Sequence, residues 1–182
     1  MQIPFPNKKY NIIYADPPWH FQNYNNAKAH TNPTRHYPTM SMKEIAELPV
    51  GDIADKDCIL FMWCTDPLLD KQIPIVKEWG FTYKTVAFHW AKTNKDKRKN
   101  YYVKGTGYWT RANNEICILA TKGKPKRVDG NVNRLVVSER RGHSRKPDRI
   151  RADIVRLMGD ISRIELFARQ VWDGWDCWGN EV

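Results

Sequence analysis

Short apolar runs recur along the chain and alternate with segments of mixed polarity. Residues 10–15 (YNIIYA) and 58–63 (CILFMW) are almost wholly apolar, a pattern typical of strands that are buried on both faces. Further segments have the length and composition of strands: 82–91, 114–121, 135–137 and 162–167. The pattern therefore predicts strands distributed over most of the chain.

Capping signals predict helices between these strands. Ser41 and Glu44 form a capping box directly before an apolar stretch, so a short helix is expected to start there. A second helix is expected to begin at Asp66–Pro67, which have N-cap and N1 chemistry, and to end at Gly80. A third is expected over Pro147–Gly159.

The alternation of strands and helices indicates the fold class. Strands that are apolar on both faces need helices on both sides, so we expect an α/β fold with a mostly parallel sheet between two layers of helices. The chain has 182 residues, which suits one domain with a substantial core. No internal repeat or linker divides the chain, so residues 1–182 are expected to form a single domain.

The stretch Asp16-Pro17-Pro18-Trp19 follows the first apolar run directly. In an open α/β sheet, ligands bind outside the carboxyl ends of the strands, which is where Asp16 is expected to lie. The two prolines stiffen the backbone and remove two N–H donors. The Asp16 carboxylate and the Pro17 carbonyl are therefore expected to offer two acceptors that no local amide occupies, an arrangement that suits an –NH₂ group.

These residue types match what methyl transfer to the amino group of adenine requires. That nitrogen is a weak nucleophile because its lone pair is delocalised into the ring. Hydrogen bonds to Asp16 and Pro17 would free the lone pair, and the carboxylate would stabilise the positive charge that develops as a methyl group arrives. Trp19 is expected to offer a flat surface to a base lifted from its stack. The alternative interpretation is an N-cap aspartate followed by a rigid turn.

The charge of the chain indicates a polyanionic partner. The net charge is +10 and the pI is near 9.5, and a basic single domain of this kind is typically drawn to nucleic acid. Much of the excess charge lies in residues 92–104, 122–127 and 140–151. A long loop without periodicity is expected over residues 20–40, and loops of that length inside a domain are usually functional.

Composition disfavours several other classes of site. The histidines and cysteines show no H-x-x-x-H, H-x-E or C-x-x-C spacing, so we expect neither a metal site nor a disulfide framework, and the zinc-dependent base deaminases are disfavoured. No apolar run approaches the roughly 20 residues that cross a membrane. The first ten residues lack a signal-peptide core, so an intracellular, soluble protein is expected.

Further motifs carry a resemblance to one known family. They are HYPTMS (36–41), ILFMW (59–63), KGTGYWTRANNEICILATKGKP (104–125), SRKPD (144–148) and RIELFAR (163–169). Over nearly its whole length the chain resembles the DPPW-type adenine-N(6) methyltransferases, which include the catalytic subunit of the eukaryotic mRNA adenosine methyltransferase. The GTGYWTR form is most similar to the phage and bacterial DNA branch. The resemblance implies a permuted, Rossmann-like class I methyltransferase fold that uses S-adenosylmethionine.

The resemblance also implies roles for particular residues. The catalytic turn would be the DPPW stretch itself: Asp16, Pro17, Pro18 and Trp19. The cofactor would be bound by residues from both ends of the chain: Asp16, Lys146, Glu165, Phe167, Arg169 and Asn180. Lys146 would meet its methionine end, Glu165 and Arg169 its ribose, and Asn180 its adenine ring. The target base and strand would be contacted by loop residues: Tyr37, Lys95, Lys97, Arg98 and Arg111.

The resulting hypothesis is transfer of a methyl group from S-adenosylmethionine to the exocyclic amino group of adenine in DNA, without a metal ion. The same reaction on RNA is an alternative, because recognition of the 2′-hydroxyl depends on loop geometry. A non-catalytic nucleic-acid-binding subunit is another. The expected setting is the cytoplasm of a bacterial cell or of a phage-infected host, with the protein as a monomer or a homodimer.

Overall fold

The structure, a computed structural model, describes residues 4–20, 39–96, 98, 100–105, 107, 109–142 and 145–182. Its strands form one sheet and are β1 (Tyr10–Ala15), β2 (Ala54–Cys64), β3 (Thr82–Thr93), β4 (Asn114–Lys122), β5 (Leu135–Glu139), β6 (Arg163–Leu166) and β7 (Asp176–Trp178). Its helices are α1 (Met42–Ala46), α2 (Val50–Ile53), α3 (Leu69–Glu78) and α4 (Arg149–Met158), with the 3₁₀ helix η2 (Asp66–Leu68) leading into α3.

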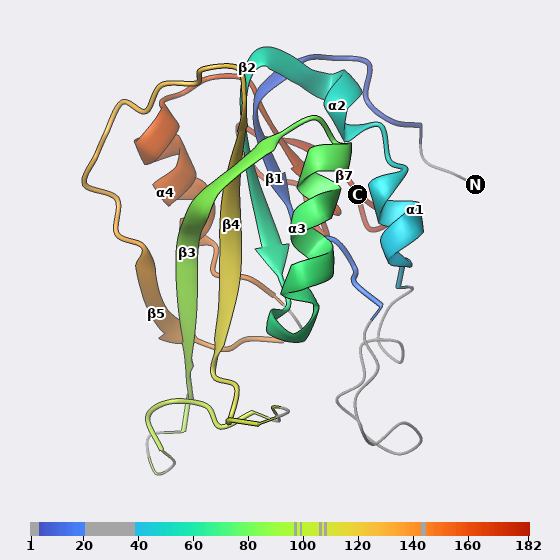
Figure 1. The fold of residues 1–182 in the computed structure, drawn as a ribbon. Coiled ribbons are helices and arrows are strands. Elements are labelled where there is room, and N and C mark those ends of the chain that lie inside the picture. The colour runs from blue at the N-terminus through green and yellow to red at the C-terminus, as the bar shows by residue number, and fades with distance from the viewer. Residues whose placement is uncertain are drawn as a thin grey trace.

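The strand order places the first strand near the middle of the sheet and the last strands beside it. Within the described residues the order is β5-β3-β4-β2-β1-β6-β7. Most neighbours are parallel, as the sequence predicted, but β4 runs antiparallel to both β2 and β3. The reason is that the chain leaves β3 and re-enters β4 at the same edge, through residues 94–113, which project beyond the sheet in Figure 1.

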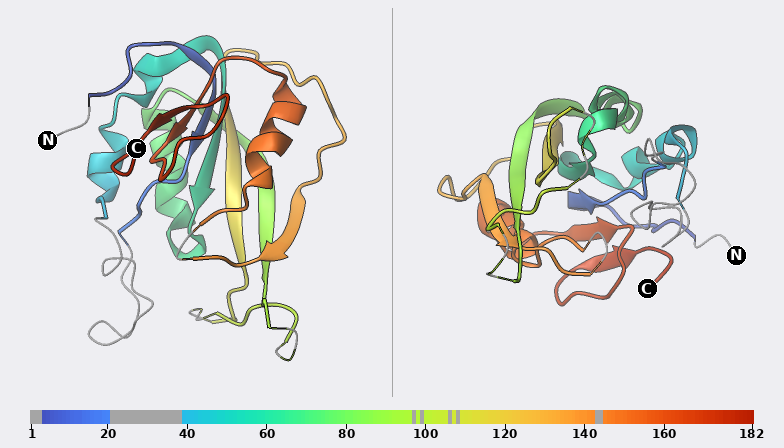
Figure 2. Two further views of the ribbon diagram at one scale, coloured as in Figure 1. Left: turned by 180° about the vertical axis from the view of Figure 1, so that it is seen from behind. Right: turned by 90° about the horizontal axis from the view of Figure 1, so that it is seen from below.

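Two apolar cores lie on opposite faces of the sheet. On one face, buried side chains of α1, α2 and α3 such as Ile45 and Val76 pack against Ile13 and Leu60. On the other, α4 packs against the sheet and Trp175 through its buried residues, including Ile154. Figure 1 shows α3 in front of the sheet, and the rear view in Figure 2 shows α4 and the last residues on the opposite side. The predicted α/β fold with helices on both faces is confirmed.

Local signals set most of the element ends. The capping box at α1 is present, since the Ser41 hydroxyl accepts from the Glu44 N–H at 3.2 Å and the Glu44 carboxylate accepts from the Ser41 N–H at 2.7 Å. The helix expected from Pro147 begins two residues later, at Arg149. It is closed by Gly159, whose φ of 88° is a conformation that favours glycine. Strand β7 was not predicted, because its three residues are too few to show a period.

The longest α-helices of the described residues, α3 and α4, have 10 residues each. No helix in these parts of the chain is therefore long and apolar enough to cross a membrane.

Candidate active site

The DPPW turn begins where β1 ends, at the carboxyl edge of the sheet. Asp16 directly follows Ala15, the last residue of β1, and its N–H donates to the carbonyl of Leu166 in β6 at 3.4 Å. Parallel pairing places β1 between β2 and β6. The turn therefore lies in the middle of the sheet, at the end where open α/β sheets bind ligands.

The backbone of the turn differs in one respect from the expectation. The Trp19 N–H donates to the Pro17 carbonyl at 2.8 Å, so the prediction that no local amide would occupy this acceptor was wrong. The hydrogen bond joins residues two positions apart, which is the pattern of a γ-turn. A carbonyl oxygen has two lone pairs, so Pro17 still offers one acceptor site.

Trp19 is packed into the core beneath the turn. Its side chain is 7% exposed, and its indole N–H donates to the Trp63 carbonyl at 3.0 Å. The backbone of the turn is also tied to residues after the long loop, because the Met40 N–H donates to the Pro18 carbonyl at 2.9 Å. In the structure Trp19 thus anchors the turn to β2, and its predicted stacking on a base stays a prediction.

Lys146 reaches the DPPW turn from the segment just before α4. Its Nζ donates to Asp16 Oδ1 at 2.8 Å and to Asp16 Oδ2 at 2.7 Å. Lys146 is 8% exposed and lies over the ring of Trp63, with Nζ 5.4 Å from the ring centroid. The structure therefore brings together two predicted residues that are 130 positions apart. Contact between Lys146 and a cofactor stays a prediction.

Two further charged residues extend this contact, and the sequence did not single them out. Glu115 Oε2 in β4 lies 3.2 Å from Lys146 Nζ, and the other oxygen of Glu115 pairs with Lys92 of β3. Four side chains thus form a row in which positive and negative charges alternate, hereafter the ion-pair row: Lys92, Glu115, Lys146 and Asp16. A usable signal was present, because Glu115 is an acidic residue next to the apolar run Ile116–Ala120 in a strand.

Burial and the neighbouring charges together set the pKa of each carboxylate. Burial raises the pKa of Glu115, but Lys146 and Lys92 outweigh burial and hold that pKa below its usual value. Burial also raises the pKa of Asp16, and here Lys146 only partly opposes it, so the pKa stays above the usual value. Burial alone would lower the pKa of Lys146, yet the two carboxylates raise it. The two carboxylates therefore favour the ammonium form of Lys146.

The predicted ribose contact, Glu165, is held by an arginine. Glu165 lies on β6 and is 5% exposed. Arg151 of α4 donates hydrogen bonds to both of its carboxylate oxygens, with Arg151 Nε 2.6 Å from Oε2. The guanidinium of Arg151 stacks on Trp172, 4.0 Å from the ring centroid. Arg151 Nη1 and Trp172 Nε1 are buried and have no hydrogen-bond partner within the described residues.

This arrangement fits the cofactor that the resemblance implies. The Glu165 carboxylate can accept hydrogen bonds from ribose hydroxyls. The N–H groups of Arg151 Nη1 and Trp172 Nε1, which make no hydrogen bond within the described residues, can donate to hydroxyl oxygens or to ring nitrogens. The sequence missed Arg151 and Trp172, because nothing in the local pattern of α4 shows that an arginine of this helix will reach β6.

The remaining predicted cofactor residues gather where β6 ends and the chain finishes. Phe167 has a φ of 63°, which turns the chain sharply after β6. The Ala168 N–H then donates to the Trp178 carbonyl at 2.9 Å, and Arg169 Nε lies 2.8 Å from Glu181 Oε1. Asn180 is exposed and directly precedes Glu181. The turn after β6 and the last residues therefore form one unit, although their contact with a cofactor stays a prediction.

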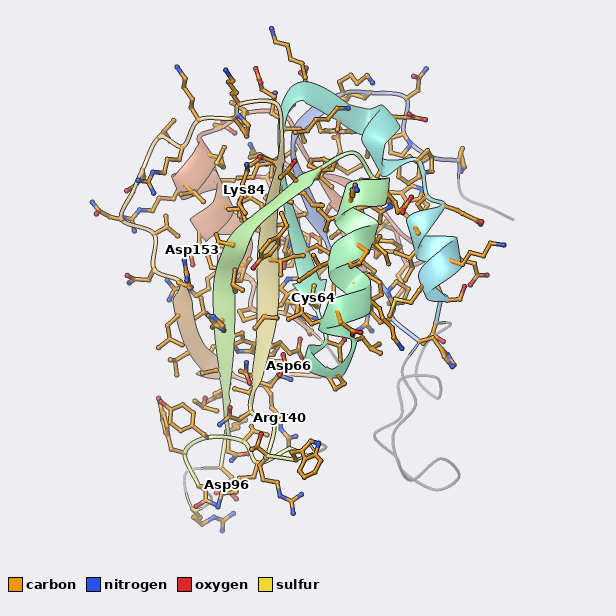
Figure 3. The ribbon with its side chains drawn as sticks, in the orientation of Figure 1. Cys64, Asp66, Lys84, Asp96, Arg140 and Asp153 are labelled. Atoms are coloured by element: carbon orange, nitrogen blue, oxygen red, sulfur yellow. The ribbon has the colours of Figure 1, made fainter. Side chains whose placement is uncertain are left out.

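The predicted substrate contacts lie mostly on residues 94–113, hereafter the arm. Lys95 and Arg111 are exposed, and Arg98 is paired with Asp96 through two hydrogen bonds of 3.0 and 3.1 Å. Figure 3 shows Asp96 on the arm at the same end of the molecule as Arg140. Tyr37 and Lys97 lie outside the described residues.

Comparison with known proteins identifies the family. The family model described as MT-A70 matches residues 10–181. The chain belongs to the MT-A70 family. It is 36% identical to the type II methyltransferase M.MunI of Mycoplasma sp, over 97% of this chain and 79% of that protein.

Eukaryotic relatives of the MT-A70 family are matched over a smaller part of their length. A putative N(6)-adenosine-methyltransferase MT-A70-like protein of Medicago truncatula is 32% identical over 96% of this chain and 26% of its own. The human N(6)-adenosine-methyltransferase catalytic subunit METTL3 is 29% identical over 96% of this chain and 28% of its own. The chain thus spans about a quarter of the length of these relatives.

The predicted family and the predicted enzyme class, methyltransferase, are confirmed by this membership. MT-A70 methyltransferases generally depend on S-adenosylmethionine. Within the described residues no three His, Cys, Asp or Glu side chains gather as a candidate metal site.

Proposed function

We propose that this chain transfers a methyl group from S-adenosylmethionine to the exocyclic amino group of adenine in DNA. The observation that carries the proposal is the position of Asp16. It stands on a proline-stiffened turn at the carboxyl edge of the sheet, and both of its oxygens lie within 2.8 Å of the Lys146 ammonium. A fixed carboxylate at this edge is suited to an amine that becomes positively charged during the reaction.

Asp16 and Pro17 hold the amine in this proposal. The two amino protons of adenine donate to an Asp16 oxygen and to the second lone pair of the Pro17 carbonyl. When bound, S-adenosylmethionine supplies an electrophilic methyl group on a sulfonium. As the new N–C bond forms and the methyl–sulfur bond breaks, with its electron pair returning to sulfur, positive charge would pass to the nitrogen. Asp16 would stabilise this charge more than it stabilises the ground state. Asp16, whose pKa is raised by burial, is also in place to take up the proton that the nitrogen loses.

Lys146 is the cation that would meet a ligand carboxylate in this proposal. It donates to both oxygens of Asp16 and lies 3.2 Å from Glu115 Oε2, so an incoming carboxylate would compete with these acceptors. Each Asp16 oxygen has a second lone pair, which can accept from the amine. The remaining cofactor contacts in the proposal are those from the turn after β6 and the last residues: Glu165, Phe167, Arg169 and Asn180.

DNA is favoured over RNA as the substrate because of the extent of the match to each kind of relative. The chain aligns with 79% of the type II methyltransferase M.MunI, whereas it covers only 28% of human METTL3. The net charge of +10 suits a nucleic acid without distinguishing its kind. Three exposed cations of the arm would contact the strand, Lys95, Arg98 and Arg111. Lys97 and Tyr37, which lie outside the described residues, are proposed to contact the strand and the target base respectively. The proposed location of this protein is the bacterial cytoplasm, because that is where its proposed substrate, DNA, lies.

The test uses the whole chain, labelled S-adenosylmethionine and matched DNA and RNA oligonucleotides, each single- and double-stranded. Label should enter DNA at adenine N6, located by nuclease digestion and chromatography of nucleosides. Turnover on RNA alone would overturn the choice of DNA. Absence of cofactor binding in a direct titration would instead assign the chain to the non-catalytic subunits.

A further inference from the structure

The arm is built as two successive turns on a paired base. Backbone hydrogen bonds close the first turn, with the Asn94 N–H donating to the Tyr101 carbonyl at 2.9 Å, and a second set closes the next, with the Gly105 N–H donating to the Ala112 carbonyl at 2.7 Å. Figure 1 shows the described residues of the arm projecting from the carboxyl edge of the sheet, and the right-hand view in Figure 2 shows that edge from below.

Trp109 stands at the tip of the second turn and is 99% exposed. The turn is tight, because a Cβ on Gly107 would come within 1.8 Å of the Thr110 carbonyl oxygen. By contrast, Trp63 and Trp79 are buried to 1% and 2% exposure. Among the exposed large hydrophobic side chains of the described residues, Trp109 has the greatest exposed fraction. An indole in this position contributes nothing to packing, so its place is explained by a binding partner.

The charges around Trp109 indicate which partner. Residues 94–113 contain six basic residues and one acidic residue. Lys104 and Arg111, which flank the second turn, are both exposed, and Arg140 lies at the same end of the molecule in Figure 3. Exposed aromatic rings among cations are the combination with which proteins bind nucleic-acid strands, the cations meeting phosphates and the rings stacking on bases. Tyr101 and Tyr102 of the arm are exposed as well, at 66% and 46%, but they pack against each other with ring centroids 4.9 Å apart. A protein partner would be met by a broader apolar patch with fewer charges.

The base of the arm is connected to the catalytic turn. Lys92 and Glu115 stand on the strands that enter and leave the arm, and Glu115 contacts Lys146, which contacts Asp16. The arm and the residue that would receive the target amine are therefore joined through one row of ion pairs. We propose that Trp109 stacks on a nucleobase of the DNA substrate near the target adenine and so positions the strand for methylation. The identity of the substrate in this inference rests on the proposed function.

The experiment compares Trp109→Ala and Trp109→Phe with the wild type. Equilibrium binding to a fluorescently labelled DNA oligonucleotide is measured at one fixed salt concentration, single- and double-stranded. Because stacking on an aromatic ring contributes about 1–3 kcal/mol per base, Trp109→Ala should weaken binding about 5- to 100-fold. Trp109→Phe, which keeps a ring, should recover most of the affinity. Melting temperatures should be unchanged, because the side chain packs against nothing.

A matched control is available at the opposite end of β3. Tyr83 is also an exposed aromatic residue, at 39% exposure, and it lies at the start of that strand rather than on the arm. Tyr83→Ala should bind DNA as the wild type does. Equal affinity of Trp109→Ala and wild type would overturn the inference. So would a wild-type oligomer that dissociates in Trp109→Ala while DNA affinity is kept, because Trp109 would then be a protein contact.

The outcome is separable from that of the proposed function. If the wild type binds DNA but transfers no methyl group, and Trp109→Ala weakens that binding, the stacking inference stands and the proposed activity fails. If the wild type methylates DNA and Trp109→Ala keeps both its affinity and its KM, the activity stands and the stacking inference fails.

Discussion

The substitution Asp16→Asn tests the central carboxylate with the smallest change of shape. Asparagine keeps the volume and one acceptor oxygen, but it removes the negative charge and turns an NH₂ group towards the site. That group would meet either the Lys146 ammonium or the substrate amine, both of which are donors. The variant therefore removes the electrostatic stabilisation of the methylated nitrogen without leaving a cavity.

Loss of one preorganised electrostatic contact typically lowers kcat by about 10²- to 10³-fold, and this is the expected loss for Asp16→Asn. The effect on stability should be smaller. Breaking a buried ion pair costs about 3–5 kcal/mol, but Lys146 keeps Glu115 at 3.2 Å and the Asp16 side chain is 28% exposed. We therefore expect a loss of about 1–2 kcal/mol, which lowers the melting temperature of a chain of this length by about 3–6 °C.

The assay is single-turnover methylation of a DNA oligonucleotide at saturating S-adenosylmethionine, with the cofactor Kd measured separately by calorimetry. Asp153→Asn is the matched control, because Asp153 also forms an ion pair, with Arg149 at 3.0 Å, but on α4 outside the ion-pair row. The control should keep its rate. The cofactor Kd of Asp16→Asn should not rise, since Lys146 loses a competing partner. A methylation rate within about ten-fold of the wild type would refute the role of the carboxylate.

Three further expectations concern pH, packing and salt. Lys146→Met removes the cation that opposes the burial-raised pKa of Asp16; Asp16 acts when ionised, so the acid limb of the kcat–pH profile should move to higher pH, and an unmoved limb would contradict the pairing. Gly179→Ala places a Cβ 2.2 Å from the Ala168 carbonyl oxygen, and overpacking of this kind costs about 1–3 kcal/mol, so the melting temperature should fall. Cofactor affinity should fall with it if the turn after β6 and the last residues bind the cofactor. The double variant Lys95→Gln/Arg111→Gln should reduce the slope of log affinity for DNA against log salt by about 2 if both cations contact phosphates, and an unchanged slope would remove them from the interface.

Local sequence patterns were sufficient for the parts of the fold that depend on neighbours in the chain. The apolar run over residues 10–15 forms β1 in full, and the capping box at Ser41 starts α1 as expected. Periodicity could not reveal β7, because three residues contain no repeat. It also could not show that β4 would run against both of its neighbours, since direction is decided by where the arm returns the chain to the sheet.

The partners within the site were less predictable than its position. Asp16 was placed at the end of a strand from the pattern alone, and the resemblance added Lys146. Glu115 and Arg151 were missed, because each acts on a residue of another element: Glu115 on Lys146 before α4, and Arg151 on Glu165 of β6. The sequence also did not show that Trp19 would pack against β2, where its indole N–H donates to the Trp63 carbonyl.

The sequence by itself thus determined which segments become strands, where the proline turn follows β1, and that the chain carries an excess of positive charge. The tertiary structure decided which charges meet. The ion-pair row draws its residues from four separate parts of the chain, and only the strand order and register bring them together: Asp16, Lys92, Glu115 and Lys146. The physical reason is that secondary structure follows from short-range sterics and periodic burial, whereas the pairing of buried charges depends on distances that exist only after the sheet has assembled.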